Sequence, residues 1–153
     1  MVSKVITATA IGLDAYKIDV EVDFINSLPN ICIVGLPDTA VTESRERVRS
    51  AVKNSGFSVP AKRIVINLAP AEIKKEGANF DLAIAIGILV QSEVIEQVKI
   101  KDFGFIGELS LDGTLRPVNG VLPLVLGLKN IGVHSVIVPK ENGLLFPVHN
   151  QDV

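Results

Sequence analysis

Apolar and polar residues alternate along two neighbouring stretches at the start of the chain. In residues 16–24, Ile18 and Val20 share one face with the other apolar residues, and one lysine and three acidic side chains occupy the opposite face. This period of two, with one polar face, is typical of a half-buried strand. A turn at residues 12–14 predicts that residues 5–11 form its partner strand.

The rest of the chain alternates between strand and helix patterns. Short apolar runs between Gly and Pro predict strands, and longer amphipathic or wholly apolar runs predict helices. Asp38 or Thr39 is predicted to cap the first helix and Asn79 the second; Asp81 could instead bind a partner donor. This order predicts an α+β domain with a mixed sheet and three main helices. The predicted strands are 30–35, 62–69, 103–108, 114–117 and 134–138, and the predicted helices run from Pro37 to about residue 53, over 80–92 and over 122–130.

Length and composition restrict the class of protein. The chain has 153 residues, of which 48% are hydrophobic and 21% charged, so it fits one globular domain. Its formal net charge is −2, which gives no overall positive field for nucleic acid or an anionic membrane. Any nucleic-acid binding therefore needs a local patch of cations. The absence of Trp and the single Tyr disfavour an aromatic platform for single strands.

The few cysteine and histidine residues disfavour a disulfide or a metal centre. Cys32 is the only cysteine, and neither His134 nor His149 stands at ligand spacing from it. The longest apolar run, residues 82–90, is shorter than the roughly 20 residues that a membrane-spanning helix needs. The first residues lack a secretory signal. We therefore expect a cytoplasmic protein with no metal site and no membrane partner.

Three sequence blocks carry a family resemblance, and no phosphate-binding loop of the Walker type is among them. These blocks are Ile33–Asp38 with Glu43–Ala51, Asn67–Ala71 with Lys75–Leu82, and Gly107–Gly120. Together they resemble the N-terminal domain of magnesium-chelatase-like AAA+ ATPases of the ComM and YifB type. The resemblance implies that an AAA+ motor follows and that ATP and magnesium belong to it. We expect residues 1–139 to form this N-terminal domain, without a cofactor, and residues 140–153 to form a connector.

The same blocks resemble, more distantly, the proteolytic domain of Lon and the Lon-like part of RadA. This implies a ribosomal protein S5 domain 2-like (Lon protease-like) fold. Lon-type peptidases use a Ser nucleophile and a Lys base, and the matching positions here hold Asn79 and Leu122. An amide is not a nucleophile here and a leucine takes no proton. The resemblance therefore predicts the scaffold without the peptidase.

Basic residues recur near the first helix and after it. Arg45, Arg49 and Lys53 are spaced by four residues and so share one helix face. If these residues meet the basic residues that follow the helix, they form a local cationic patch. The alternative to such a patch is a solvated helix face, on which Glu43 pairs with Arg47 and Glu46 with Arg49. The candidate contacts to DNA or to a neighbouring subunit are Arg45, Arg47, Arg49, Lys53, Lys62, Arg63, Lys74 and Lys75.

The sequence thus predicts a non-catalytic accessory domain. Its expected partners are its own AAA+ domain, neighbouring subunits of a hexamer and possible DNA, since the resemblance implies branch migration in natural transformation. Two alternatives remain open: a Lon-type Ser–Lys peptidase with a displaced dyad, and a stand-alone small-molecule-binding domain.

Overall fold

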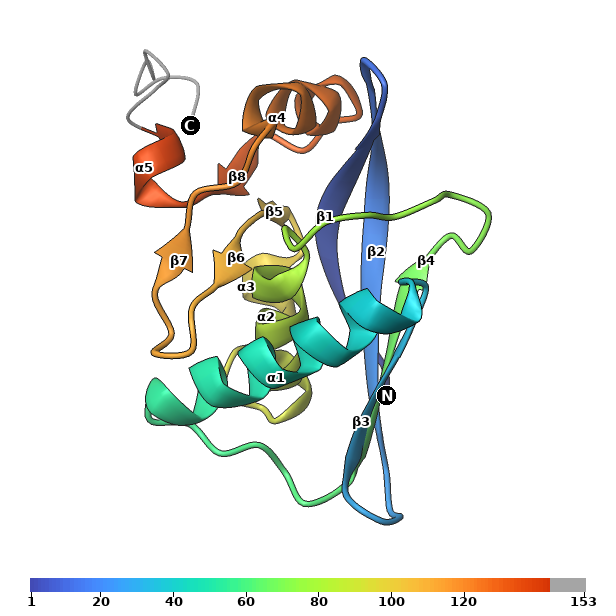
Figure 1. The fold of residues 1–153 in the computed structure, drawn as a ribbon, viewed down its shortest axis with the longest axis vertical. Coiled ribbons are helices and arrows are strands. Elements are labelled where there is room, and N and C mark those ends of the chain that lie inside the picture. The colour runs from blue at the N-terminus through green and yellow to red at the C-terminus, as the bar shows by residue number, and fades with distance from the viewer. Residues whose placement is uncertain (144–153) are drawn as a thin grey trace.

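A long antiparallel hairpin runs through the centre of the fold in the computed structural model, which describes residues 1–143 (Figure 1). β1 (Ser3–Ile11) pairs with β2 (Asp14–Ile25), so that Val5 lies opposite Val20. The two strands meet in a tight turn at Gly12, whose φ is +62°. The predicted hairpin is confirmed.

The hairpin is the middle of a six-stranded mixed sheet. The other strands are β3 (Asn30–Val34), β4 (Arg63–Ala69), β5 (Phe103–Phe105) and β8 (Ser135–Ile137), in the order β3-β4-β2-β1-β5-β8. β4 pairs antiparallel with β2, while the pairs β3–β4, β1–β5 and β5–β8 are parallel. This confirms the predicted α+β class with a mixed sheet.

Three long helices account for the predicted helical segments: α1 (Asp38–Asn54), α2 (Asp81–Gln91) and α4 (Val121–Asn130). Two further helices, α3 (Gln97–Ile100) and α5 (Lys140–Gly143), were not predicted, because four residues make too short a periodic signal. Asn142 of α5 is buried and exchanges two hydrogen bonds of 2.9 Å with the backbone of Val118. The connector role of residues 140–153 stays a prediction, and residues 144–153 lie outside the described part.

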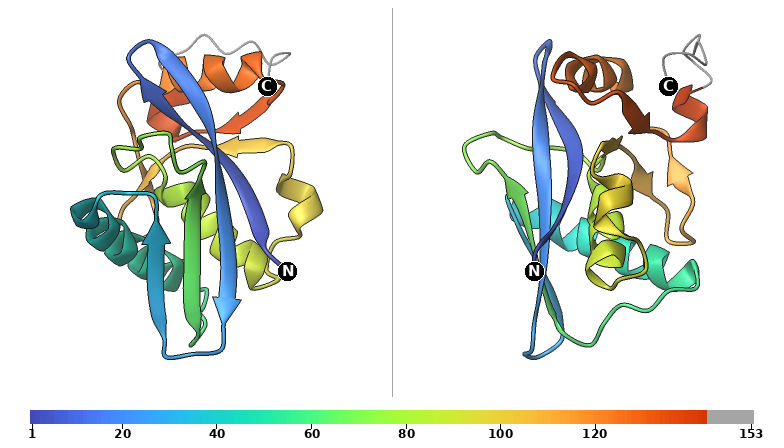
Figure 2. Two further views of the ribbon diagram at one scale, coloured as in Figure 1. Left: turned by 90° about the vertical axis from the view of Figure 1, so that its right-hand side faces the viewer. Right: turned by 180° about the vertical axis from the view of Figure 1, so that it is seen from behind.

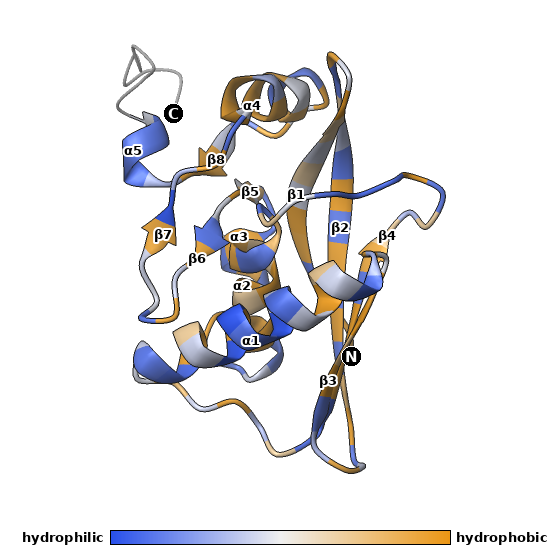
Figure 3. Ribbon diagram, viewed as in Figure 1, coloured by the Kyte–Doolittle hydropathy of each residue, from blue (hydrophilic) through white to orange (hydrophobic). Residues whose placement is uncertain are grey.

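The core forms where α2 and α4 pack closely against the β1–β2 hairpin. α2 packs against β1 and β2 through Gly87, where an added Cβ would lie 2.6 Å from Cγ2 of Val22. α4 meets the hairpin in the same way at Gly127, beside Ala15. α4 lies along the upper part of the hairpin (Figure 2). Figure 3 shows α2 and α4 largely in hydrophobic colours and α1 largely in hydrophilic ones.

Two local predictions are wrong in detail. The strand predicted at 103–108 is interrupted, because the backbone of Gly107 bonds to Asn79 and Leu82 instead of continuing the ladder. It becomes β5 and then β6 (Glu108–Leu109), which forms a separate two-stranded sheet with β7 (Leu115–Arg116). The first helix has Pro37 at its N-cap and no side-chain cap bond, so Asp38 lies inside its first turn.

Candidate functional site

Asn79 is tied to the sheet and does not cap the second helix as predicted. Its amide Nδ2 donates a hydrogen bond of 3.0 Å to the carbonyl of Ala8 in β1. The N-cap of α2 is Phe80, without a side-chain cap bond. The first turn is instead held by the carbonyl of Gly107, which accepts from the backbone N–H of Leu82 at 3.1 Å. Asn79 therefore fixes the segment that precedes α2.

The two positions that correspond to the Lon dyad differ in their surroundings, although Gly120 and Leu124, which flank Leu122, line the hollow of Asn79. Asn79 lines a hollow of about 460 Å³ together with Glu76, Glu108 and Asn119. Leu122 is 47% exposed and lines a different hollow, between α4 and the hairpin turn. Among the described residues, no Ser, Cys, Lys or His lines the hollow of Asn79. The described lining residues therefore do not include the Ser–Lys pair of a Lon-type peptidase, whereas the hydroxyl of Thr9 and the carboxylate and amide groups can accept or donate hydrogen bonds.

Asp81 is the centre of a buried polar network that joins three elements. Its carboxylate accepts from Ser44 Oγ at 2.7 Å, from Arg47 Nε at 2.6 Å and from the backbone N–H of Leu109 at 3.1 Å. A fourth bond, of 3.2 Å, comes from Arg47 Nη2. Asp81 itself is fully buried. The network therefore connects α1 and β6 to the start of α2.

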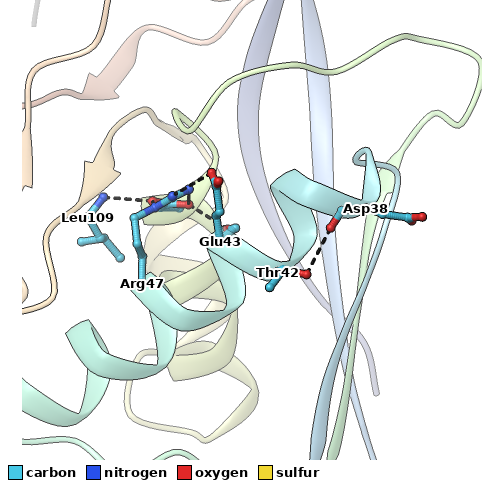
Figure 4. A network of polar contacts seen from close by, with 7 residues as sticks. Asp38, Thr42, Glu43, Arg47 and Leu109 are labelled. Carbon is cyan, nitrogen blue, oxygen red and sulfur yellow. Dashed lines mark hydrogen bonds and ion pairs between the residues drawn. The ribbon is translucent and has the colours of Figure 1, made fainter.

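Arg47, predicted as a contact to DNA or a subunit, belongs to this network (Figure 4). The hydrogen bond with Asp81 raises the pKa of the guanidinium above its ordinary value, and burial opposes this shift only in part. Glu43 lies 3.8 Å from the same guanidinium, which confirms the predicted pair. The buried carboxylate of Asp81 is therefore the main partner of Arg47, and a contact of Arg47 with DNA or a subunit stays a prediction.

Lys75, another predicted contact to DNA or a subunit, is buried. Its ammonium donates to the carbonyl of Pro70 at 2.5 Å and to that of Ile73 at 2.7 Å. Burial lowers its pKa below the ordinary value. Lys75 thus holds the segment between β4 and α2 in place.

Three of the predicted cations meet in one place. Arg49, Lys53 and Lys62 line a hollow of about 570 Å³ that also contains the exposed ring of Phe57. Glu46 lies 3.3 Å from Arg49, which confirms the other predicted pair.

The remaining predicted cations do not line this hollow. Arg45 lies 4.0 Å from Glu46. Lys74 forms an exposed ion pair of 2.8 Å with Glu76, and the hydrogen bond with Lys74 lowers the pKa of Glu76. Arg63 begins β4 at the surface. The hollow therefore brings together three of the predicted cations, and a contact role for the others stays a prediction.

The part of the chain that the structure describes contains neither a cluster of metal-ligating side chains nor a membrane-spanning helix. Within residues 1–143, no three Cys, His, Asp or Glu side chains gather as a metal site would require. No helix within that range is long and apolar enough to cross a bilayer.

Sequence comparisons place this fold among known proteins. The chain is 44% identical over 138 residues to competence protein ComM of Haemophilus influenzae, covering 90% of this chain and 27% of that protein. It is 46% identical over 136 residues to the uncharacterized protein YifB of Escherichia coli, covering 89% and 27%. Lon protease 2 of Thermus thermophilus is 29% identical over 131 residues, covering 80% and 16%. The chain thus spans about a quarter of the length of its ComM and YifB relatives.

A family model gives the assignment. The model described as subunit ChlI of Mg-chelatase matches residues 20–142, which is well over half of the chain. The matched region contains the Asp81 network, Asn79 and the three gathered cations. The chain therefore belongs to the family of subunit ChlI of Mg-chelatase.

Proposed function

We propose that this chain is the N-terminal accessory domain of a ChlI-type AAA+ ATPase and that it helps to assemble the ATPase ring. In this proposal the domain has the ribosomal protein S5 domain 2-like scaffold of Lon and no peptidase activity. The observation that carries the proposal is the identity of the residues at the two Lon dyad positions, because the amide of Asn79 and the alkyl side chain of Leu122 offer neither nucleophile nor base. The similarity to a Lon protease supports the shared scaffold.

ATP and magnesium belong, in this proposal, to a longer protein of which this chain is one part. The relatives named ComM and YifB are about four times as long as the region that matches. The family description supports an ATPase in that longer protein. The accessory domain contributes contacts that hold subunits in the ring, and the motor supplies the hydrolysis.

A direct contact with DNA is a second candidate function, and one observation favours it. Arg49, Lys53 and Lys62 gather at one hollow on a chain that is otherwise net negative. Cations of this kind can neutralise backbone phosphates, and the exposed ring of Phe57 could stack on a base. The name of the Haemophilus relative suggests DNA taken up during competence as the substrate class.

The accessory role is tested on the parent protein that contains this chain. Native mass spectrometry with a slowly hydrolysed ATP analogue would compare the parent with a version that lacks residues 1–143. We expect the intact protein to form rings and the shortened one to form severalfold fewer at equal concentration. Equal ring formation by both, or cleavage of a peptide substrate by this purified chain, would overturn the proposal.

The DNA contact is tested by the fluorescence anisotropy of a labelled single strand at low salt. This second candidate predicts that binding is lost in Lys53→Glu/Lys62→Glu and kept in Lys99→Glu/Lys101→Glu, which makes the same change in net charge at another exposed site. Equal binding by the two variants would show that the hollow does not contact DNA.

A further inference from the structure

The turn of the β1–β2 hairpin carries an exposed apolar projection. Leu13 is 97% exposed, more than any other large apolar side chain among the described residues. It lies beside α4, which buries Leu124 and Leu128 and leaves further apolar side chains on its outer side. A helix that is apolar on both sides is usually covered on both sides. We call this surface the tip patch; it consists of Leu13, Tyr16, Leu122, Leu126 and Ile131, each at least 40% exposed.

An apolar hollow lies at the other end of the molecule. The hairpin turn is at the top of Figure 1, and the β2–β3 turn and the segment after α1 are at the bottom, at opposite ends of the longest axis. We call the lower surface the end hollow. It measures about 570 Å³ and is lined by Pro29, Ile31, Phe57, Val59, Pro60, Ala61 and Ile64, with Arg49, Lys53 and Lys62 among its polar residues.

The two surfaces are complementary in charge as well as in polarity. Asp14 is exposed directly beside Leu13 at the hairpin turn. In the end hollow, neither Lys53 nor Lys62 has a carboxylate within 4.0 Å among the described residues. An acid next to an apolar knob therefore matches cations around an apolar hollow.

We propose that the tip patch of one copy of this chain docks in the end hollow of the next copy. Leu13 enters among the apolar lining residues, and Asp14 meets Lys53 and Lys62. Because the two surfaces lie at opposite ends, the contact is head-to-tail, and such contacts generate a closed ring or an open filament. The inference rests on the proposed role in ring assembly and specifies the surfaces that perform it.

A nucleic-acid strand would compete for the same cations. The observations favour a second copy, because apolar side chains outnumber polar ones in the lining of the end hollow. Phosphates would use the cations and leave the exposed apolar side chains of Pro29 and Phe57 without a partner. The hairpin turn presents an apolar side chain and a carboxylate together, so it can use both parts of the lining.

Sedimentation velocity of this chain tests the contact over a wide concentration range. We expect the unchanged chain to associate as its concentration rises. Leu13→Asp removes the knob, and Lys53→Glu/Lys62→Glu reverses the charge of the hollow, so each variant should weaken association about tenfold or more. Val98→Asp and Lys99→Glu/Lys101→Glu make matched changes at exposed sites that line neither surface and should associate normally.

Mixing the two interface variants gives the decisive measurement. The intact tip patch of Lys53→Glu/Lys62→Glu can dock in the intact end hollow of Leu13→Asp. The two surfaces that stay free in this complex are the altered ones, so neither can bind a further copy. The mixture should therefore form a one-to-one dimer and nothing larger. A contact between two identical surfaces would not predict this result.

Three outcomes would overturn the inference. The unchanged chain could stay monomeric at every concentration. Both interface variants could associate like the unchanged chain. Ring assembly would then use another surface, and the proposed function would still stand, because the deletion of residues 1–143 tests it separately. Lys53→Glu/Lys62→Glu could lose single-strand binding while no variant alters association, which would assign the end hollow to nucleic acid.

Discussion

Removing the carboxylate of Asp81 should destabilise the fold more than any change of a surface charge. Asp81→Ala deletes four hydrogen bonds at once, because the carboxylate accepts from Ser44, twice from Arg47 and from the backbone of Leu109. The change also leaves the guanidinium of Arg47 without its main partner. The hydrogen bonds that Ser44 and Arg47 of α1 and Leu109 of β6 make to the start of α2 all end on this carboxylate.

The size of the effect follows from the exposure of the two partners. Breaking a buried ion pair by removing one member costs about 3–5 kcal/mol. The Arg47 side chain is 21% exposed and keeps Glu43 at 3.8 Å, so water and Glu43 compensate it in part. We therefore expect Asp81→Ala to lower the free energy of unfolding by about 3 kcal/mol. Arg47→Ala should cost about 2–3 kcal/mol, because it leaves the buried carboxylate with Ser44 and Leu109 as its only donors.

The assay is urea unfolding of the unchanged chain, the two single variants and the double variant. The four free energies give a coupling energy, which we expect to be about 1–3 kcal/mol for Arg47 and Asp81. The exposed pair Glu46 and Arg49 is the control and should give less than about 0.5 kcal/mol. A coupling energy for Arg47 and Asp81 as small as the control value would refute the reasoning.

Three further changes test other parts of the structure. Gly87→Ala should lower the free energy of unfolding by about 1–3 kcal/mol in spite of the better helix propensity of Ala, because the new methyl group meets Val22; a more stable variant in urea would contradict this. Burial lowers the pKa of Lys75 below its ordinary 10.5, so between those two pKa values the unfolded chain binds more protons than the folded chain. The unfolding free energy of the unchanged chain, relative to that of Lys75→Met, should therefore rise with pH up to about 10.5, and a flat or falling difference in alkaline urea titrations would argue against it. Asn142→Ala should cost about 1–2 kcal/mol and speed amide hydrogen exchange at Val118, whereas unchanged exchange would show that α5 does not hold this segment.

Periodicity in the sequence was sufficient for the hairpin, the central strands and α1, whereas the wholly apolar α2 was predicted from its length and candidate caps. The alternation around Val20 and the apolar stripe of α1 are local signals, and burial of one face makes them unambiguous. The break at Gly107 could not be predicted in this way, because it depends on bonds to Asn79 and Leu82, far away in the sequence. The short helices α3 and α5 gave no periodic signal.

The candidate site was predicted less well, because the partner of each cation is set by tertiary structure. In the sequence, Arg47 and Arg49 have the same candidate role because both are cations of the first helix. Arg47 differs in position, since it lies three residues after the buried Ser44 and next to the buried Val48. The position of Arg47 near the buried side of α1, together with the single acid Asp81 at the start of the otherwise apolar α2, was a usable signal for a buried ion pair. No such signal marked Lys75, whose partners are backbone carbonyls.

The most direct test of this account is an electron cryomicroscopy structure of the parent protein with a slowly hydrolysed ATP analogue and a single DNA strand. The account predicts rings in which Leu13 and Asp14 of one subunit lie against Lys53 and Lys62 of the next, with no peptide bound at Asn79. Rings in which these domains do not touch, or in which DNA fills the end hollow, would contradict it.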